Sequence, residues 1–200
     1  VYCGEPTLEN DRLTVEWKRS DESEMNRIKT QLSGLYNFSN VMAAITVARY
    51  FGVSSKKINQ AIANYTPENH RSQIQETEKG NTLIIDCYNA NPSSMNAAIE
   101  NLGKHPEGKT IAILGDMFEL GERTELEHNE SIRRLTEHGI DECILVGKAF
   151  AAASESHANE TRFETTAAAA QFLKSNTIHN ATILIKGSRS MKLEELLELL

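Results

Sequence analysis

The spacing of apolar residues divides the chain into two parts with different periods. In the first part, residues 13 to 17 (LTVEW) alternate apolar and polar, which is typical of one strand of a half-buried antiparallel sheet. A helix is predicted to begin after Asn37, a candidate N-cap, and to stop at Gly52. The apolar residues on one face of this helix are Val41, Ala44, Ile45, Ala48 and Phe51. Their spacing predicts a buried amphipathic helix.

A second helix and a linker complete the first part. The apolar positions of this helix are Ile58, Ala61 and Ile62. The helix must end before Pro67, because the residue that precedes a proline avoids the helical region. We therefore expect a linker near residues 65–69, with one domain at 1–66 and another at 67–200. Because the chain begins at Val1 without an initiator Met, the first domain is expected to be the edge of a larger one.

After the linker, short apolar runs rich in Ile and Val alternate with helical stretches. The runs lie at residues 82–86, 110–114, 142–146 and 182–186. Nearly continuous apolar runs of this kind suit parallel strands that are covered on both faces. The helices are expected near residues 92–103, 122–138, 148–157 and 166–175, with one more strand at 161–164. The alternation predicts an α/β fold with an open, mostly parallel sheet and helices on both faces.

The ends of these strands are the places to look for ligands. In open α/β sheets, ligands bind in the crevice outside the carboxyl ends of the strands. The loops that follow Asp86, Leu114, Val146 and Lys186 are therefore expected to carry the functional side chains.

Composition and charge exclude several classes of function. The chain has 21 Lys and Arg against 28 Asp and Glu, and its net charge of −7 argues against holding nucleic acid or an anionic membrane by long-range attraction. No apolar run approaches the about 20 residues that cross a bilayer, and no signal peptide is evident, so we expect a soluble cytoplasmic protein. The three cysteines lie far apart without a CxxC pair, which argues against a disulfide framework or a cysteine-built zinc site.

One segment matches a phosphate-binding loop in its letters but not in its context. Residues 103–110 (GKHPEGKT) satisfy the pattern GxxxxGK[ST]. A phosphate loop follows a strand and opens a helix, whereas this segment follows a predicted helix and opens a predicted strand. We therefore reject it as a nucleotide site and expect that the chain by itself does not hold a triphosphate.

The densest group of polar residues follows the predicted strand at 82–86. Asp86 can accept hydrogen bonds from a ribose or hold the shell of a cation, and Tyr88, Asn89 and Asn91 offer directional donors and acceptors. The alternative is a helix entry in which Asn91 is the cap and Pro92 lies in the first turn. Both can hold at once, and the position at a strand end favours a ligand site.

Two further polar groups follow later strands. Asp116 and Glu119 lie between two glycines and could orient an amine or the shell of a Mg²⁺ ion, or they could be solvated acids. Lys186 and Arg189, beside small residues, could hold a carboxylate or phosphate, or they could form a solvated basic turn. His128 is interpreted as a surface or capping residue rather than a catalyst.

Several segments, taken in order, resemble the Mur ligase family. They are GLYNFSN at 34–40 followed by VMAA at 41–44, NHR at 69–71, DCYNANP at 86–92, LGDMFELG at 114–121 with His128, and KGSR at 186–189. The YNANP and LGDMxELG patterns are the most specific, and they resemble the members that join D-Ala-D-Ala to a muramoyl tripeptide. Tyr36 departs from the family pattern, because many relatives carry His there.

This resemblance implies a domain organisation. Mur ligases have one domain for a UDP-sugar, a central ATPase domain with a phosphate loop, and a C-terminal Rossmann-like domain. Residues 1–66 would then be the end of the central domain, and residues 67–200 the Rossmann-like, doubly wound ligase domain. The phosphate loop would lie upstream, so the chain alone is expected to be inactive, and a monomer is expected.

The resemblance also implies a reaction. ATP with Mg²⁺ phosphorylates the carboxylate of UDP-N-acetylmuramoyl-tripeptide, and the amine of D-Ala-D-Ala attacks the acyl phosphate in a step of peptidoglycan synthesis. The residues implied near the nucleotide are Asn37, Asn40, His70, Asp86 and Tyr88, with Arg71 at the γ-phosphate. Tyr88, Asn89 and Asn91 would line the junction between ATP and the dipeptide. The residues implied in dipeptide recognition are Asp116, Glu119, Lys186, Ser188 and Arg189. Among all of these, Asn89, Asn91 and Asp116 are expected to act in catalysis.

Two other functions are kept as alternatives. A folate polyglutamate ligase belongs to the same superfamily, and the YNANP segment counts against it. A non-catalytic α/β binding module could use the same loop ends as a ligand pocket, because a fold does not fix a function. A phosphate loop in the reading frame upstream of Val1 would favour a ligase over such a module.

Overall fold

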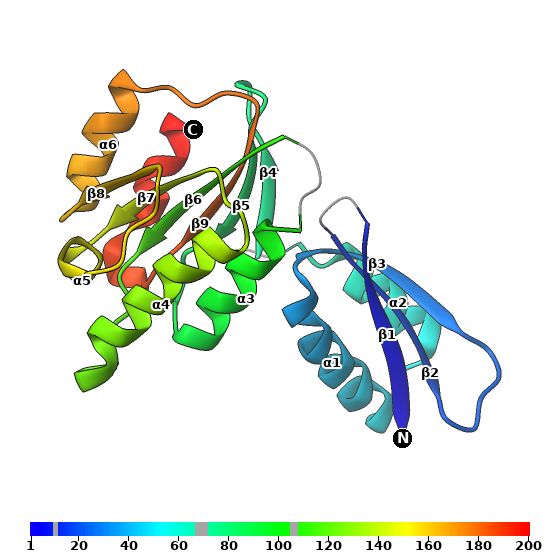
Figure 1. Cartoon of the computed structure of the whole chain (residues 1–200). Coiled ribbons are helices and arrows are strands. Elements are labelled where there is room, and N and C mark those ends of the chain that lie inside the picture. Colours follow the sequence, from blue (N-terminus) through cyan, green and yellow to red (C-terminus); the bar gives the residue numbers. More distant parts are fainter. Residues whose placement is uncertain (10–11, 67–71, 105–107) are drawn as a thin grey trace. The chain divides into compact units, whose positions relative to one another are not determined.

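The chain divides into two compact units, Val1–Glu68 and Asn69–Leu200. We describe them from a computed structural model, in which residues 1–9, 12–66, 72–104 and 108–200 are described. Each unit has a sheet of its own (Figure 1). None of the described helices has the length and apolar character that a membrane crossing requires.

The first unit packs two helices against a three-stranded antiparallel sheet. Its elements are β1 (Tyr2–Glu9), β2 (Arg12–Arg19), β3 (Asn26–Ser33), a 3-10 turn (Leu35–Asn37), α1 (Phe38–Tyr50) and α2 (Ser55–Asn64). The strand predicted at 13–17 is confirmed as the middle of β2, where Leu13, Val15 and Trp17 are fully buried. The sequence did not predict β1 and β3, which pair with the two edges of β2.

The buried face of α1 is narrower than its sequence pattern predicted. Val41 and Ile45 are buried, but Ala44 is exposed and Phe51 is 76% exposed, so the prediction was wrong for these two residues. Phe51 lies beyond the last helical residue, Tyr50. Residues four apart on a helix share a face, and the short core of this unit is filled by Val41 and Ile45 together with the sheet.

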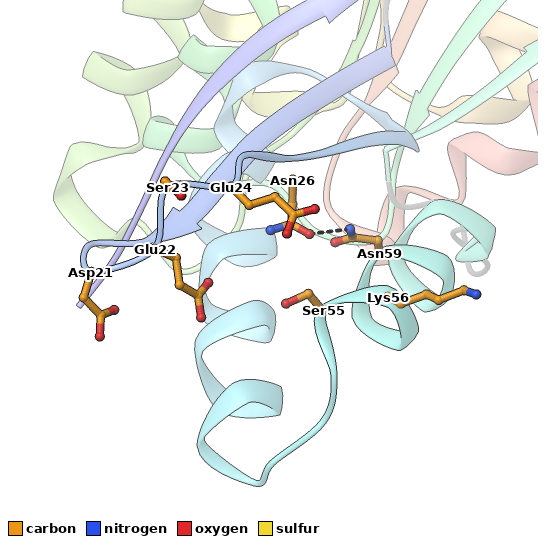
Figure 2. A pocket seen from close by; sticks show the side chains of 8 residues that line it. All are labelled: Asp21, Glu22, Ser23, Glu24, Asn26, Ser55, Lys56 and Asn59. Carbon is orange, nitrogen blue, oxygen red and sulfur yellow. Dashed lines mark hydrogen bonds between the residues drawn. The ribbon is translucent and has the colours of Figure 1, made fainter.

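Hydrogen bonds between side chains tie the sheet of the first unit to α2. The indole N–H of Trp17 donates to Asn59 Oδ1 (2.9 Å), and Asn59 Nδ2 donates to Asn26 Oδ1 (2.9 Å), as Figure 2 shows for the second bond. An open pocket of about 730 Å³ lies beside this pair, with Asp21 and Glu22 among its lining residues. These two carboxylates form ion pairs with arginines of the same unit, so the pocket is not simply a cluster of unpaired acids.

The second unit is built on a six-stranded, mostly parallel sheet. Its strands are β4 (Gln73–Glu76), β5 (Thr82–Asp86), β6 (Lys109–Gly115), β7 (Glu142–Val146), β8 (Glu160–Phe163) and β9 (Ala181–Lys186). They are arranged in the order β4-β5-β9-β6-β7-β8, and β4 alone pairs antiparallel. The predicted α/β fold and its five parallel strands are confirmed, while the edge strand β4 was missed.

Helices cover both faces of this sheet, as predicted. The helical elements are α3 (Pro92–Leu102), α4 (Thr124–Glu137), α5 (Lys148–Ala152), α6 (Thr166–Ser175) and 3-10 turns at Gly121–Arg123, Arg189–Met191 and Leu193–Leu199. Ile84 packs with α3, α4 and α5 in one core, whereas its neighbours Leu83 and Ile85 pack with α6 and the last 3-10 turn in another. This alternation is the period-two geometry of a strand that is buried on both sides.

Helix α5 is shorter than predicted. It ends at Ala152, and Ala153 has extended backbone angles, so the expected helix at 148–157 was too long. The guanidinium of Arg162 on β8 donates to the carbonyls of Phe150 (3.1 Å) and Ala153 (2.6 Å). These bonds satisfy carbonyl groups that a longer helix would have used, so they stabilise the early stop.

A single buried amide joins the chain's last residues to the start of the sheet. Asn81 is fully buried, and its Nδ2 donates to the carbonyls of Ile178 and Leu200 (2.9 Å each). Its Oδ1 accepts the N–H of Ala181 (3.1 Å) at the start of β9. One side chain therefore satisfies three backbone groups from two distant segments.

We expect Asn81→Ala to destabilise the second unit. The variant leaves buried backbone groups without partners, which predicts a loss of about 2–4 kcal/mol in the free energy of unfolding. Asn176→Ala is the control, because Asn176 is exposed and bonds only within its own helix turn, and there the change should stay below about 0.5 kcal/mol. Equilibrium urea unfolding measures both, and equal stability of the two variants would contradict the role given to Asn81.

The cysteines differ in their exposure. Cys3 is exposed, whereas Cys87 and Cys143 are buried. Burial raises the pKa of the Cys87 thiol to about 12, and nearby acids add to the effect. Burial likewise raises the pKa of the Cys143 thiol to about 12. Both folded-state pKa values lie above the ordinary value, so ionisation of these thiols favours the unfolded chain as the pH rises toward 12.

Thiol labelling tests this difference. Because the thiolate is the reactive form, iodoacetamide at pH 8 should modify Cys3 in the native protein and leave the two buried thiols unmodified. All three should react in denaturing urea, and mass spectrometry counts the adducts. Rapid modification of Cys87 or Cys143 under native conditions would show that these thiols are accessible.

Candidate functional site

The loops after three neighbouring strands meet at one open pocket of the second unit. The pocket has a volume of about 680 Å³. Its lining residues are Asn89, Ala90, Asn91, Phe118, Glu119, Leu120, Ser188, Arg189 and Ser190. They follow β5, β6 and β9, which are adjacent because β9 lies between the other two. These are three of the four strand-end loops that were expected to carry functional side chains, and the loop after β7 does not contribute to the lining.

The residues after β5 form both a helix entry and part of the pocket. Asn91 caps α3: its Oδ1 accepts the N–H of Ser94 (2.9 Å), and its own N–H donates to Ser94 Oγ (3.2 Å). Pro92 occupies the first turn, so the predicted helix entry is confirmed. Asn89 Oδ1 accepts the N–H of Ala90 (2.9 Å). Each amide oxygen already accepts one hydrogen bond inside the protein, and the Nδ2 groups of Asn89 and Asn91 are the donors that these residues can offer a ligand.

The lysine that ends β9 is paired inside the protein. Lys186 is 1% exposed, and its Nζ lies 2.5 Å from Asp86 Oδ2, on the neighbouring residue of β5. The same Nζ donates to the carbonyl of Asn89 (3.4 Å), and Asp86 Oδ1 accepts the N–H of Ser72 (3.3 Å). The structure therefore places Lys186 against Asp86 and outside the pocket lining, where the sequence had predicted a contact with a ligand carboxylate.

Asp116 is also engaged within the fold. It is buried, and its carboxylate accepts the N–H groups of Ala149 (2.9 Å) and Phe150 (3.0 Å) at the start of α5. A Cβ at Gly147 would lie 2.1 Å from Asp116 Cγ, so the turn before α5 needs glycine there. Asp116 was predicted to orient an amine or a cation shell, but its carboxylate caps a helix instead, and it does not line the pocket.

Two charged side chains remain at the pocket. Arg189 is exposed, and its guanidinium lies over the ring of Tyr88, 4.9 Å from the ring centre. Glu119 is exposed and has a positive φ of 65°, an uncommon conformation for a residue with a side chain. Ser188, which precedes Arg189, is buried. Its Oγ accepts the N–H of Phe118 (3.2 Å), so its hydroxyl hydrogen can be donated to a ligand.

Of the two roles expected for His128, a surface residue or a capping residue, the first is wrong, because His128 is fully buried. Its Nε2 lies 3.1 Å from the N of Met117 and 3.6 Å from Asp116 Oδ1, and its Nδ1 lies 2.7 Å from the carbonyl oxygen of Thr124. Its ring packs edge-on against Phe150, with 4.6 Å between ring centres. His128 is thus part of the support beneath the loop that follows β6.

The residues predicted to contact adenine are only partly described. Asn37 is buried and its Nδ2 donates to the carbonyl of Ser33 (2.8 Å), while its Oδ1 accepts from Asn40 Nδ2 (3.3 Å). The structure therefore brings Asn37 and Asn40 together at the start of α1. His70 and Arg71 lie outside the described residues.

The segment at 103–110, which matches the letters of a phosphate loop, follows a helix and leads into a strand, as predicted. Gly103 is the C-cap of α3, and Lys109 begins β6. Lys109 Nζ forms an ion pair with Glu142 (2.8 Å) on β7. Residues 105–107 lie outside the described residues. A helix end followed by a strand start does not present the converging N–H groups of a phosphate loop.

Some lining residues were not predicted from the sequence. Phe118 and Leu120 flank Glu119, and Phe118 is 49% exposed. A large apolar side chain between acidic residues, directly after a buried strand, is the signal that could have indicated it. No group of three or more His, Cys, Asp or Glu that could hold a metal ion occurs within the described ranges.

The sequence of the chain is similar to that of a known protein family and to those of two bacterial enzymes. Residues 70–189 match the family described as Mur ligase, glutamate ligase domain. The chain is 34% identical over 173 residues to the UDP-N-acetylmuramoyl-tripeptide–D-alanyl-D-alanine ligase of Bacillus subtilis (strain 168), which covers 82% of this chain and 38% of that protein. It is 32% identical over 171 residues to the enzyme of the same name from Escherichia coli (strain K12), covering 84% of this chain and 38% of that protein.

Solved structures show the same architecture. A crystal structure of MurF from Acinetobacter baumannii superposes with a TM-score of 0.84 at 27% identity, covering 97% of this chain and 43% of that one. MurF from Thermotoga maritima in complex with ADP shares the fold, with a TM-score of 0.81 at 23% identity over 99% of this chain and 45% of that one. The chain thus spans less than half the length of these relatives. It belongs to the Mur ligase family, with the C-terminal domain of that family at residues 70–189.

Proposed function

We propose that this chain is the C-terminal part of an ATP-dependent ligase that adds D-Ala-D-Ala to UDP-N-acetylmuramoyl-tripeptide. Residues 1–66 would be the end of the ATPase domain and residues 67–200 the ligase domain, in a cytoplasmic enzyme of peptidoglycan synthesis. The names of the relatives at 34% and 32% identity support this reaction. The pocket at the ends of β5, β6 and β9 is proposed to hold the dipeptide.

The charge pattern of the pocket carries the proposal. Among its nine lining residues, Arg189 is the cation and Glu119 the anion. A free dipeptide is a zwitterion, so its carboxylate can pair with the guanidinium, which binds carboxylates through two hydrogen bonds, and its amine end can be oriented near Glu119. The Nδ2 groups of Asn89 and Asn91 and the hydroxyl of Ser188 supply further donors.

The chemistry that this pocket would serve is the attack of an amine on an activated carboxyl group. ATP supplies activation, because a carboxylate is a poor acylating agent and an acyl phosphate has a good leaving group. The ammonium group of the dipeptide first loses a proton to solvent, and the lone pair of the resulting amine forms the new bond to the carbonyl carbon. Phosphate leaves with the electrons of the broken C–O bond, and the nitrogen releases a second proton to solvent to give the neutral amide. The contribution of this chain is to position that nitrogen.

We also propose contacts with the ATP that the complete ligase would use. Asp86 already accepts from Ser72 and Lys186, and its side chain is 13% exposed. A carboxylate has about four acceptor positions, so Asp86 can still accept a ribose hydroxyl. We propose this contact for Asp86 and adenine contacts for Asn37, Asn40 and His70. Arg71 is proposed at the γ-phosphate, Tyr88 beside the nucleotide, and Mg²⁺ on the phosphates.

Arg189→Ala in the complete ligase tests dipeptide recognition. Loss of a charge-assisted, two-bond contact should lower kcat/KM for D-Ala-D-Ala by about 30- to 1000-fold, equivalent to roughly 2–4 kcal/mol. The KM for ATP should change less than the KM for D-Ala-D-Ala, because Arg189 lines the pocket proposed for the dipeptide and reaches the proposed nucleotide side only through the ring of Tyr88. Steady-state kinetics with each substrate varied in turn measures both effects.

Arg133→Ala is the matched control, because Arg133 is a half-exposed arginine on α4 whose partners are Glu130 and Glu155. Its kinetics should match those of the wild type. A silent Arg189→Ala variant would mean that the turn at 186–189 is merely solvated. Use of L-glutamate in place of D-Ala-D-Ala by the wild-type enzyme would support the folate-type alternative, and absence of any ligation would support a binding module.

A further inference from the structure

The loop that brings Phe118 and Glu119 to the pocket is held through its backbone. The N–H of Asp116 donates to the carbonyl of Val146 (3.0 Å), and its carbonyl accepts the N–H of Ser188 (3.2 Å). The N–H of Phe118 donates to Ser188 Oγ (3.2 Å). These bonds connect the loop to the ends of β7 and β9. The N–H of Met117, between Asp116 and Phe118, is directed at a side chain of α4.

That side chain is His128, and its contacts assign a donor and an acceptor role to its two ring nitrogens. Its Nδ1 lies 2.7 Å from the carbonyl oxygen of Thr124, which can only accept, so Nδ1 carries the hydrogen. The Nε2 atom then has a lone pair and accepts the N–H of Met117 (3.1 Å). The ring is 0% exposed and packs against Phe150, which restricts its rotation. The neutral Nδ1–H tautomer is the form that satisfies both contacts.

The backbone conformation of Glu119 depends on the hydrogen bond between Met117 and His128. Glu119 has a φ of 65°, and a non-glycine residue keeps such a conformation only when the surrounding structure enforces it. Met117 is buried, so without the acceptor at His128 its N–H would have no partner and the loop would gain by rearranging. Such a rearrangement would displace Phe118 and Glu119 from the pocket lining.

We propose that His128 is a positioning residue for the pocket at the ends of β5, β6 and β9. It is not among the lining residues, and it acts through the N–H of Met117 to fix where Phe118 and Glu119 stand. The inference rests on the proposed function for the identity of the ligand, D-Ala-D-Ala. The hydrogen bond itself can be tested without that assumption.

A second buried histidine in the same unit provides a matched control. The Nε2 of His157 lies 2.9 Å from the carbonyl oxygen of Ile140, and its Nδ1 accepts the N–H of Asn159 (3.1 Å). His157 is 8% exposed and does not line the pocket. An Asn at either position is long enough to replace Nδ1 but not Nε2. His128→Asn and His157→Asn therefore each lose one buried bond to the backbone, and only the first loosens the loop.

The experiment uses the complete ligase with three variants, H128N, H128Q and H157N. In H128N the KM for D-Ala-D-Ala should rise about tenfold or more, with the KM for ATP changed less than about twofold. A Gln oxygen reaches the place of Nε2, so H128Q should restore the dipeptide KM to within about threefold of the wild type. H157N should lower the melting temperature as H128N does and leave both KM values unchanged.

Hydrogen–deuterium exchange at the Met117 amide supplies the second readout. Exchange should be faster in H128N than in the wild type, H128Q or H157N. Replacing Met117 by its α-hydroxy acid analogue removes the same N–H without touching His128, and it should raise the dipeptide KM as H128N does. This variant also carries the test if H128N does not accumulate as folded protein.

The outcomes separate the two proposals. Equal rises in dipeptide KM for H128N and H157N, or a normal KM in the Met117 ester variant, would overturn the positioning role. Failure of H128Q to restore both the exchange rate and the KM would overturn it as well. If the wild-type enzyme does not use D-Ala-D-Ala but the Met117 amide responds as expected, the proposed function fails while the link between His128 and the loop stands.

Discussion

The ion pair between Lys186 and Asp86 determines which charges the pocket can present. Lys186 is 1% exposed, and a lysine at that depth is stable as a cation only with a nearby anion. The two residues are register neighbours on β9 and β5, so the order of strands in the sheet brings them together. With this pair neutralised beneath the surface, Arg189 and Glu119 are left as the charged groups of the lining.

A second set of contacts fixes the loop that carries Glu119. Asp116 fills the N-terminus of α5, a position where helix N–H groups can otherwise bind an anion. Its backbone is bonded to the ends of β7 and β9, and His128 accepts the next N–H. The loop is therefore stabilised from three neighbouring elements, which suits a surface that must hold a small ligand in one orientation.

The sequence predicted β5, β6, β7 and β9 well because each is a short apolar run that is buried on both faces, whereas β8 is an edge strand without a buried residue. The sequence missed β1, β3 and β4 for the opposite reason. β3 has few buried positions and β4 has none, and β1 contains a glycine and a proline, so their strand character depends on pairing with a neighbour. The length of α5 depends on Arg162, which lies on a different strand and gives no local signal.

The sequence indicated where the candidate pocket lies, but not which polar residues pair inside the protein. The strand ends could be located from the alternation of elements alone, which is why Asn89, Asn91, Glu119, Ser188 and Arg189 were found. The sequence could not show that Lys186 faces Asp86 or that Asp116 faces α5, because a buried ion pair and a ligand contact use the same residue types. Only the register of β5 against β9 and the turn at Gly147 decide these partners.

The most direct measurement is a crystal structure of the complete ligase with D-Ala-D-Ala bound. The dipeptide should lie in the pocket after β5, β6 and β9, with its carboxylate on the guanidinium of Arg189 and its amine end toward Glu119. Lys186 should remain paired with Asp86 in that complex. A dipeptide carboxylate bound to Lys186, or a dipeptide held away from Arg189 and Glu119, would show that this pocket has been assigned wrongly.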